Sequence, residues 1–340
     1  MQTKILNSID GDYDYAVNAA SEILKNGGIV AIPTETVYGL AASAYSDSAI
    51  KAVFAAKGRP QDNPLIVHIS DLDMLSLAAR DIPDTAYECA KRFWPGPFTM
   101  VLPKGDRISN SASGGLDTVA VRMPSEKTAH DIIKTSGIPI AAPSANTSGM
   151  PSPTTAQHVI NDLNGKIDAV VIGNDCTVGI ESTVVSLTGE KPRLLRPGAV
   201  TAEMLKEVLP DLIIDNAVLE QLKSGEKAAS PGMKYKHYSP KTDAFLVEGC
   251  SNSFTKFVNQ KTDCAAICFE EEYYNINIAK ISYGSKYDES TLAKNVFSAL
   301  RDVDKLGVKS VYIHAPSKHG VGLAVYNRLI RAAAFKVIKL

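Results

Sequence analysis

The stretch AVNAASEILKNGGIVAIPTETVYGL, residues 16–40, contains a helix, a turn and a strand in succession. Between Ala16 and Leu24 the apolar residues recur at helical spacing, and Asn26-Gly27-Gly28 is a typical signal for the end of a helix. The apolar run from Ile29 to Ile32 then reads as a short buried strand, which Pro33 ends. Because helices and buried strands in succession are typical of α/β proteins, this stretch predicts that fold class.

The same alternation continues over the first two-thirds of the chain. Further strands are predicted at residues 65–69, 98–102, 118–121, 138–141, 169–172, 183–187 and 193–195. Further helices are predicted at residues 48–56 (with Asp47 as the cap), 85–92, 128–136, 155–163 and 202–208. Some of the connections have the length of a hairpin and others the length of a helix, which predicts a mixed sheet.

The pattern breaks between Ala217 and Lys241. The segment KSGEKAASPGMKYKHYSPK is polar, contains two prolines and has no apolar period, which is typical of a linker. Beyond it the alternation resumes and predicts a second, largely parallel α/β domain without a GxGxxG dinucleotide fingerprint. Its predicted strands and helices lie at residues 244–247, 253–260, 265–269, 278–282, 291–306, 310–314, 323–334 and 336–339. The predicted organisation is a larger domain at 10–212, a linker at 213–241 and a smaller domain at 242–340.

Composition limits the classes of function. Lys and Arg total 36 against 37 Asp and Glu, so no global positive charge favours tight duplex binding. The five cysteines show no CxxC pair, which indicates free thiols in a reducing compartment. The N-terminus lacks the apolar core of a signal peptide, and no apolar run approaches membrane-spanning length. These features predict a soluble, cytoplasmic protein that does not associate with a membrane.

Polar clusters follow the predicted strands, where open α/β sheets usually place their ligands. In Pro33–Leu40, Thr36 could offer a hydroxyl to a small polar ligand, although a plain turn would look the same. In the second cluster, Lys57 and Arg59 flank a glycine and could converge on a polyphosphate, with Asn63 and His68 following. The alternative for this pair is a solvated helix end.

Two further clusters carry hydroxyls and an arginine. Thr118 and Arg122 share one face of a predicted strand, which suits a substrate carboxylate or, equally, a salt bridge on an edge strand. The stretch PSANTSGMPSPT contains Ser144, Asn146 and Ser152 and has the composition of a backbone anion nest, or of a turn-rich loop.

The last cluster combines GIEST at residues 179–183 with Arg196 at the end of the next strand. Ser182 and Arg196 could face one cleft, whereas Glu181 is predicted to be solvated. The six histidines are scattered, so no metal site is predicted, and the absence of GxSxG argues against a serine hydrolase. Arginines and a lysine around small hydroxyls indicate phosphoryl or nucleotidyl chemistry without a P-loop.

Taken together, the ordered motifs resemble those of the YrdC-like threonylcarbamoyl-AMP synthases over about residues 10–210. The motifs are PTETVYGL, KGRPQDNPLIVHI, WPGPFTMVL, LDTVAVRMP, PSANTSGMPSPT, GIESTVV and RPGAV. The segments ASPGMKYKHYSP and GVGLAVYNRLIRAA resemble the linker and extra C-terminal domain of the longer members. The resemblance implies a YrdC-like mixed twisted sheet with helices and a smaller, Rossmann-like α/β domain.

The resemblance also implies a reaction and a set of site residues. Threonine and bicarbonate would form a carbamate that attacks the α-phosphate of ATP, with Mg²⁺ on the phosphates, for tRNA modification. The implied catalytic residues, placed around the phosphates and the carbonate-derived group, are Lys57, Arg59, Ser144 and Asn146. The implied ATP contacts are Arg59, Asn63, Thr118, Ser144, Ser152, Arg196 and Tyr235. The implied threonine contacts are Thr36, His68, Arg122, Ser182 and the backbone of Ala142.

Two other functions compete with the synthase. An RNA-binding module without turnover would use a concave basic surface, but the net charge of −1 argues against it. A carbamoyl transferase would carry acylphosphatase and zinc-finger segments, which this sequence lacks. The implied partners are ATP, L-threonine, bicarbonate and a downstream tRNA threonylcarbamoyl transferase, with weak direct contact to tRNA as a further expectation.

The linker itself suggests a second role. The predicted product is a mixed anhydride that water would destroy, so a segment that closes over the site would protect it. Residues 230–238 contain a Pro-Gly hinge, basic side chains and aromatic rings. This composition predicts a lid whose Tyr235 touches the nucleotide, with a passive tether as the alternative.

Overall fold

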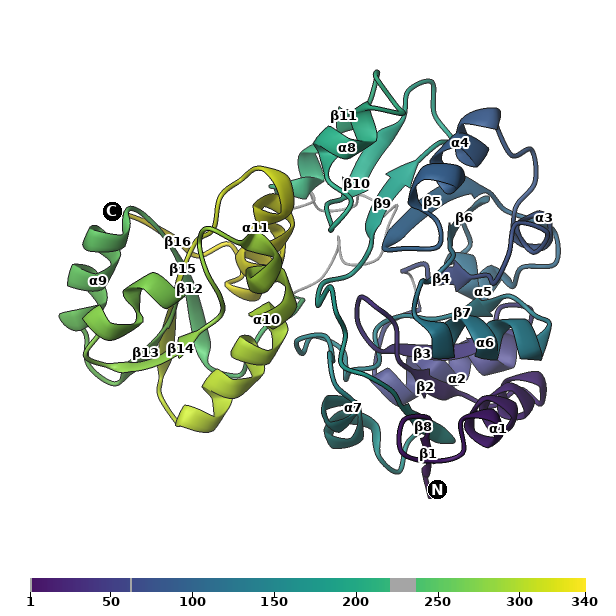
Figure 1. The fold of residues 1–340 in the computed structure, drawn as a ribbon, viewed down its shortest axis with the longest axis horizontal. Coiled ribbons are helices and arrows are strands. Elements are labelled where there is room, and N and C mark those ends of the chain that lie inside the picture. The colour runs from purple at the N-terminus through teal and green to yellow at the C-terminus, as the bar shows by residue number, and fades with distance from the viewer. Residues whose placement is uncertain (1, 62, 221–236) are drawn as a thin grey trace.

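The computed structural model describes residues 2–61, 63–220 and 237–340. Its described strands form an eleven-stranded sheet in the order β1-β8-β2-β3-β7-β4-β6-β5-β9-β10-β11 and a five-stranded sheet in the order β14-β13-β15-β12-β16. Figure 1 shows the two sheets in separate bodies, with α10 and α11 of the smaller body facing the larger one.

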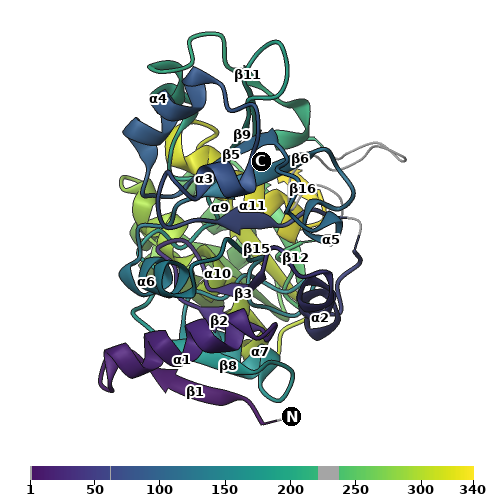
Figure 2. The ribbon, with the colours of Figure 1, turned by 90° about the vertical axis from the view of Figure 1, so that its right-hand side faces the viewer.

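The larger sheet is mixed, as predicted. Its strands are β1 (Lys4–Asn7), β2 (Val30–Ile32), β3 (Gly39–Ser43), β4 (Ile66–His68), β5 (Phe98–Pro103), β6 (Thr118–Arg122), β7 (Ile140–Ala141), β8 (Ala169–Ile172), β9 (Thr183–Ser186), β10 (Arg193–Arg196) and β11 (Ile213–Ile214). Strand β4 runs parallel to β6, whereas β5 runs antiparallel to it. In Figure 2 this sheet extends from β1 at the bottom to β11 at the top.

Helices and turns surround this sheet. They are α1 (Tyr13–Lys25), α2 (Asp47–Lys57), α3 (Leu75–Ala78), α4 (Asp84–Phe93), α5 (Asn110–Ser113), α6 (Lys127–Ser136), α7 (Ala156–Leu163), α8 (Ala202–Lys206) and the 3₁₀ turn η1 (Asn216–Val218). The capping prediction for α2 was wrong, because the Ser46 hydroxyl, rather than Asp47, accepts the Ala49 N–H and caps the helix.

The sequence patterns missed three strands of the larger sheet, β1, β11 and β3, of which β3 lies next to the site. For residues 33–40 the sequence predicts a polar turn after a strand, yet β3 begins at Gly39 and pairs antiparallel with β2. The strand contains Gly and Ala rather than β-branched residues, so its local propensity is poor. Its position is determined instead by its neighbours β2 and β7, because both faces of the strand are buried.

The smaller sheet is entirely parallel over its described pairings, as predicted. Its elements are β12 (Asp243–Glu248), α9 (Ser251–Asn259), β13 (Cys264–Cys268), η2 (Glu270–Asn275), β14 (Ala279–Ser282), α10 (Glu289–Asp302), η3 (Val303–Leu306), β15 (Ser310–His314), α11 (Gly320–Ala332) and β16 (Val337–Lys339). Helix α9 covers one face, and α10 and α11 cover the face toward the larger domain. The chain passes from one sheet to the other between β11 and β12, within the predicted linker; the exact domain limits stay predictions.

No helix in the described part of the chain is both long and apolar enough to cross a bilayer.

Candidate active site

A pocket at one side of the larger sheet gathers residues from loops far apart in sequence. It encloses about 580 Å³ of empty space, part of it open to solvent. We call it the arginine pocket, because three arginines line it. Of the implied site residues, it brings together Thr36, Arg59, His68, Arg122, Ala142, Ser144, Ser182 and Arg196.

Arg122 stands at the end of β6 and is almost fully buried. Its Nη2 lies 2.7 Å from Glu35 Oε1, and its Nη1 donates to Thr36 Oγ1 at 2.8 Å. Burial raises the pKa of Glu35, but the Arg122 charge together with hydrogen bonds from Arg122 and the backbone outweighs it and holds that pKa below its usual value. Because β6 lies between β4 and β5, the edge-strand interpretation of Arg122 was wrong, although the arginine does form a salt bridge.

His68 ends β4 beside Arg122. Its Nδ1 lies 3.1 Å from the carbonyl of Ile66. Burial and the Arg122 charge lower the pKa of His68 to about 3, so the ring is neutral at pH 7. A carbonyl accepts only from a protonated nitrogen, so Nδ1 carries the hydrogen and Nε2 can accept a hydrogen bond from a ligand.

Two histidines near the arginine pocket, His68 and His237, make folding sensitive to acid. The pKa values of His68 and His237 are lowered to about 3, while the ordinary value is 6.5. The unfolded chain therefore binds more protons between these values, and stability present above pH 6.5 is lost as pH falls. Between pH 7 and pH 5, the His68 contribution to the free energy of unfolding should fall by about 2 kcal/mol in the wild type. The His68→Gln variant lacks this group, so its free energy of unfolding should fall by about 2 kcal/mol less over the same range.

Urea titrations at the two pH values measure this difference. The exposed His319 supplies the control, and His319→Gln should behave like wild type. An unchanged pH dependence in His68→Gln would show that His68 is not held neutral by the fold.

Ser182 and Arg196 meet in the wall of the arginine pocket, as their positions suggested. Arg196 donates through Nε to the Ser182 carbonyl at 3.0 Å and through Nη2 to its Oγ at 3.2 Å. The same Oγ lies 2.7 Å from Thr99 Oγ1. Burial and the nearby Arg328 lower the pKa of Arg196 to about 10, so the group remains a cation at neutral pH.

Lys57 is buried rather than solvated, so the helix-end interpretation was wrong for this residue. Its Nζ donates to the carbonyls of Ser144 and Asn146, the latter at 2.6 Å. Asn146 in turn donates to the carbonyls of Thr147 at 2.8 Å and Met150 at 2.9 Å. Burial and the Arg59 charge hold the pKa of Lys57 well below its usual value. Lys57 therefore supports the loop that carries Ser144, while Arg59 lines the pocket itself.

Several implied residues are not part of the wall of the arginine pocket. Asn63 is fully buried, and Thr118 lies at the opposite end of β6 from Arg122, paired with Pro103. Ser152 Oγ donates to Glu181 Oε1 at 2.6 Å. Lys57 and Asn146 act on the Ser144 loop as described above. Tyr235 and most of the predicted lid, residues 230–236, lie outside the described residues.

The structure also adds residues that the sequence patterns did not assign. Glu181 was predicted to be solvated, yet it is buried and lines the pocket, so that prediction was wrong. His237 and Tyr238, at the end of the predicted lid stretch, also line it, with ring centroids 5.5 Å apart. The signal in the sequence was an aromatic pair within an otherwise polar linker. Thr34, Val37, Gly39, Ile66 and Pro143 complete the lining.

The arrangement is suited to binding anions in a partly buried site. Arg59, Arg122 and Arg196 converge on a space that also presents the hydroxyls of Thr36 and Ser144. Cations held in place by protein contacts stabilise charge that develops during a reaction. Within the described residues, no group of three or more His, Cys, Asp or Glu could hold a metal ion.

Comparisons with known proteins agree with this geometry. A family model described as telomere recombination, which covers the Sua5, YciO and YrdC proteins, matches residues 22–198. A second, described as the C-terminal domain of threonylcarbamoyl-AMP synthase, matches residues 200–334. The threonylcarbamoyl-AMP synthase of Pyrococcus abyssi is 43% identical over 347 residues, which span 99% of each chain. That of Bacillus subtilis is 41% identical over 96% of this chain and 95% of its own.

Solved structures show the same similarity in three dimensions. The crystal structure of P. abyssi Sua5 in complex with L-threonine has a TM-score of 0.92 at 39% identity, and covers 99% of this chain and 100% of that one. A P. abyssi Sua5 structure in which a His and a Tyr are replaced by Ala has a TM-score of 0.91 at 39% identity, covering 99% and 98%. With matches across both domains, the chain belongs to the threonylcarbamoyl-AMP synthase family, in its two-domain form.

Proposed function

We propose that this chain forms threonylcarbamoyl-AMP and pyrophosphate from L-threonine, bicarbonate and ATP, for the modification of tRNA. The observation that carries the proposal is the convergence of Arg122, Thr36 and His68 on one wall of a pocket whose other walls present Arg59 and Arg196. A related protein of the same fold has been crystallised with L-threonine, which supports an amino-acid substrate for the pocket.

On the threonine side, Arg122 would bind the carboxylate. It already binds a carboxylate in the structure, Glu35, and its Nη1 reaches the Thr36 hydroxyl. The neutral His68 would accept a hydrogen bond from the threonine amine or hydroxyl through Nε2. A neutral acceptor suits this position because the amine must lose a proton before it can act as a nucleophile.

On the nucleotide side, Arg59 and Ser144 would contact the phosphates and Arg196 would contact the nucleotide. Ser182, whose hydroxyl accepts a hydrogen bond from Arg196, would contact threonine. The carboxylates near the pocket are engaged by arginines, Glu35 by Arg122 and Glu181 by Arg328. The proposal therefore treats Mg²⁺ as part of the MgATP substrate, held by the phosphates. Asn63, Thr118, Ser152 and Tyr235 belong to the proposed ATP contacts by resemblance alone.

The chemistry needs no covalent enzyme intermediate. The threonine amine adds to the carbon of bicarbonate with loss of water and gives a carbamate. A carbamate oxygen then attacks the α-phosphorus, and the bond to the bridging oxygen breaks as pyrophosphate leaves. Both reactants are anions, so the arginines contribute by reducing their repulsion and by holding them in line. The product would pass to a tRNA threonylcarbamoyl transferase in the cytoplasm.

Mass spectrometry of the reaction products tests the proposal. The purified chain with MgATP, threonine and ¹³C-bicarbonate should give threonylcarbamoyl-AMP that carries the label, and omission of any one substrate should remove the product. Pyrophosphate should appear in equal amount. Tight, salt-sensitive RNA binding by a protein that makes no product under these conditions would overturn the proposal.

A further inference from the structure

The domain interface is built around a fully buried arginine of the C-terminal domain. Arg328 lies on α11 and has no exposed surface. Its Nε lies 2.8 Å from Glu181 Oε2, its Nη2 donates to the Glu181 carbonyl at 3.1 Å, and its Nη1 donates to the Pro197 carbonyl at 2.8 Å. All three acceptors belong to the larger domain, so one side chain joins two of its loops.

Glu181 connects Arg328 to the arginine pocket, because Glu181 and the next residue both line it. The carboxylate accepts Ser152 Oγ through Oε1 and Arg328 through Oε2, so both its oxygens are used. The next residue is Ser182, whose hydroxyl and carbonyl contact Arg196. Because Arg328 holds both the side chain and the backbone of Glu181, it determines where Ser182 stands in the pocket wall.

The loop around Glu181 is also packed into the second domain. Ile180 and Val37, from loops of the larger domain, lie in the hydrophobic cluster formed by α10, α11 and the smaller sheet. Gly179 has a φ of +80°, and a Cβ at this position would lie 2.4 Å from Lys294 Cα in α10. The backbone of this loop thus rests directly against the C-terminal domain.

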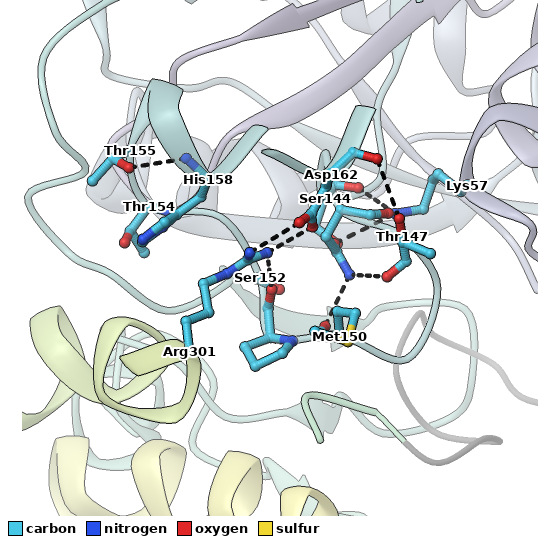
Figure 3. Close-up of polar contacts among 12 residues, drawn as sticks. Lys57, Ser144, Thr147, Met150, Ser152, Thr154, Thr155, His158, Asp162 and Arg301 are labelled. Atoms are coloured by element: carbon cyan, nitrogen blue, oxygen red, sulfur yellow. Dashed lines mark hydrogen bonds and ion pairs between the residues drawn. The ribbon is translucent and has the colours of Figure 1, made fainter. Parts of the chain in front are cut away.

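A second arginine holds the other loop. Arg301 on α10 forms a fork with Asp162, with Nη1–Oδ1 at 3.1 Å and Nη2–Oδ2 at 2.8 Å. Its Nη2 also donates to the Pro151 carbonyl at 2.6 Å. Figure 3 shows this side chain reaching from the C-terminal domain into the segment that Lys57 supports. That segment runs from Ser144 through Pro151 and carries the nucleotide side of the pocket.

Apolar contacts alone could hold the two domains together without the buried guanidinium groups of Arg328 and Arg301. Burying an arginine is costly, and replacing a buried ion pair by apolar residues is often neutral or stabilising. A forked hydrogen-bonding group, however, fixes direction in a way that apolar contacts do not. The Arg328 fork ends on the loops of Glu181 and Pro197, whereas Arg301 joins the Asp162 carboxylate of α7 to the Pro151 carbonyl of the Ser144 segment. Fixed direction would matter for both segments, because they lead into the pocket wall.

We infer that Arg328 and Arg301 are positioning residues for the synthase reaction. Arg328 acts through Glu181 and Ser182 on the threonine side of the arginine pocket, and Arg301 acts through Pro151 on the nucleotide side. The C-terminal domain is thus part of the apparatus that shapes the active site. This inference rests on the proposed function.

Steady-state kinetics on the full chain test it. In Arg328→Lys, which keeps the charge but not the fork, the KM for threonine should rise about tenfold, the effect of one lost hydrogen bond to a charged group. The KM for ATP should rise less, through the contacts of Glu181 with Ser152 and of Ser182 with Arg196. In Arg301→Lys, the KM for ATP should rise more than the KM for threonine. The double variant Glu181→Gln/Arg328→Lys should have nearly the same KM for threonine as Arg328→Lys alone, because both substitutions disrupt the same contact between Arg328 and Glu181.

The control is Val258→Ala on α9, which is buried on the far face of the smaller sheet. It should lower the melting temperature without altering either KM. The inference is overturned if both arginine variants raise the two KM values in the same proportion, or if Val258→Ala reproduces their kinetics at equal thermal stability. A wild-type chain that makes no product would instead reject the proposed function, so the two failures are distinguishable.

Discussion

The Arg122→Ala variant is expected to lose threonine binding far more than ATP binding. Without the guanidinium, the threonine carboxylate would enter a buried site with no cation to receive it. The expected loss in affinity is about 2–4 kcal/mol for a charged hydrogen-bonded pair in a dry site. Isothermal titration with threonine, and separately with a non-hydrolysable ATP analogue, measures the two affinities.

The structure shows that this variant also needs a matched control. Arg122 and Glu35 are both almost fully buried, and their ion pair spans 2.7 Å. Removing only the arginine leaves a buried carboxylate without its cation, which typically costs about 3–5 kcal/mol of stability. The double variant Arg122→Ala/Glu35→Gln removes that charge, so it should recover stability but not threonine binding. If the two ligands lose affinity equally in the double variant, Arg122 is a structural residue only.

The second large effect is expected for Lys57→Met, which keeps most of the side-chain volume. The ammonium donates to the carbonyls of Ser144 and Asn146 in the loop beside the pocket. Methionine cannot donate, so these buried carbonyls lose their partner and the loop loses its support. We expect a fall in kcat of about 100-fold, equivalent to 1–3 kcal/mol of unsatisfied polar groups, with a small change in the threonine KM.

Rapid-quench measurement of pyrophosphate formation locates this loss in the chemical step. Lys51→Met on the exposed side of the same helix should leave the rate at the wild-type value. Arg59→Ala should also slow the step, since Arg59 lines the pocket directly. A wild-type rate in both Lys57→Met and Arg59→Ala would remove the phosphate-side assignment.

Local sequence patterns were sufficient for most of the helices and strands, although they missed short ones such as β1 and α5, and for many of the pocket residues. Strands such as Ala169–Ile172 and Ser310–His314 were predicted to the residue, because an apolar run bounded by turn residues has few other solutions. Thr36, His68 and Arg122 could be predicted as candidate ligand-binding residues, because polar groups at the ends of strands meet at one edge of a sheet. The resemblance of the motifs added their roles.

The tertiary structure decided which charges are buried and which partners they have. Glu181 was expected in solvent, but it pairs with Arg328, 147 positions away in the sequence. Local sequence places Lys57 at the end of a solvated helix, but in the folded chain it is buried and its Nζ donates to the carbonyls of Ser144 and Asn146. Strand β3 has weak local propensity and exists because β2 and β7 flank it. Helix and strand periods depend on neighbours along the chain, so sequence determines them; burial and ion pairing depend on which distant segments meet, and only the folded chain determines that.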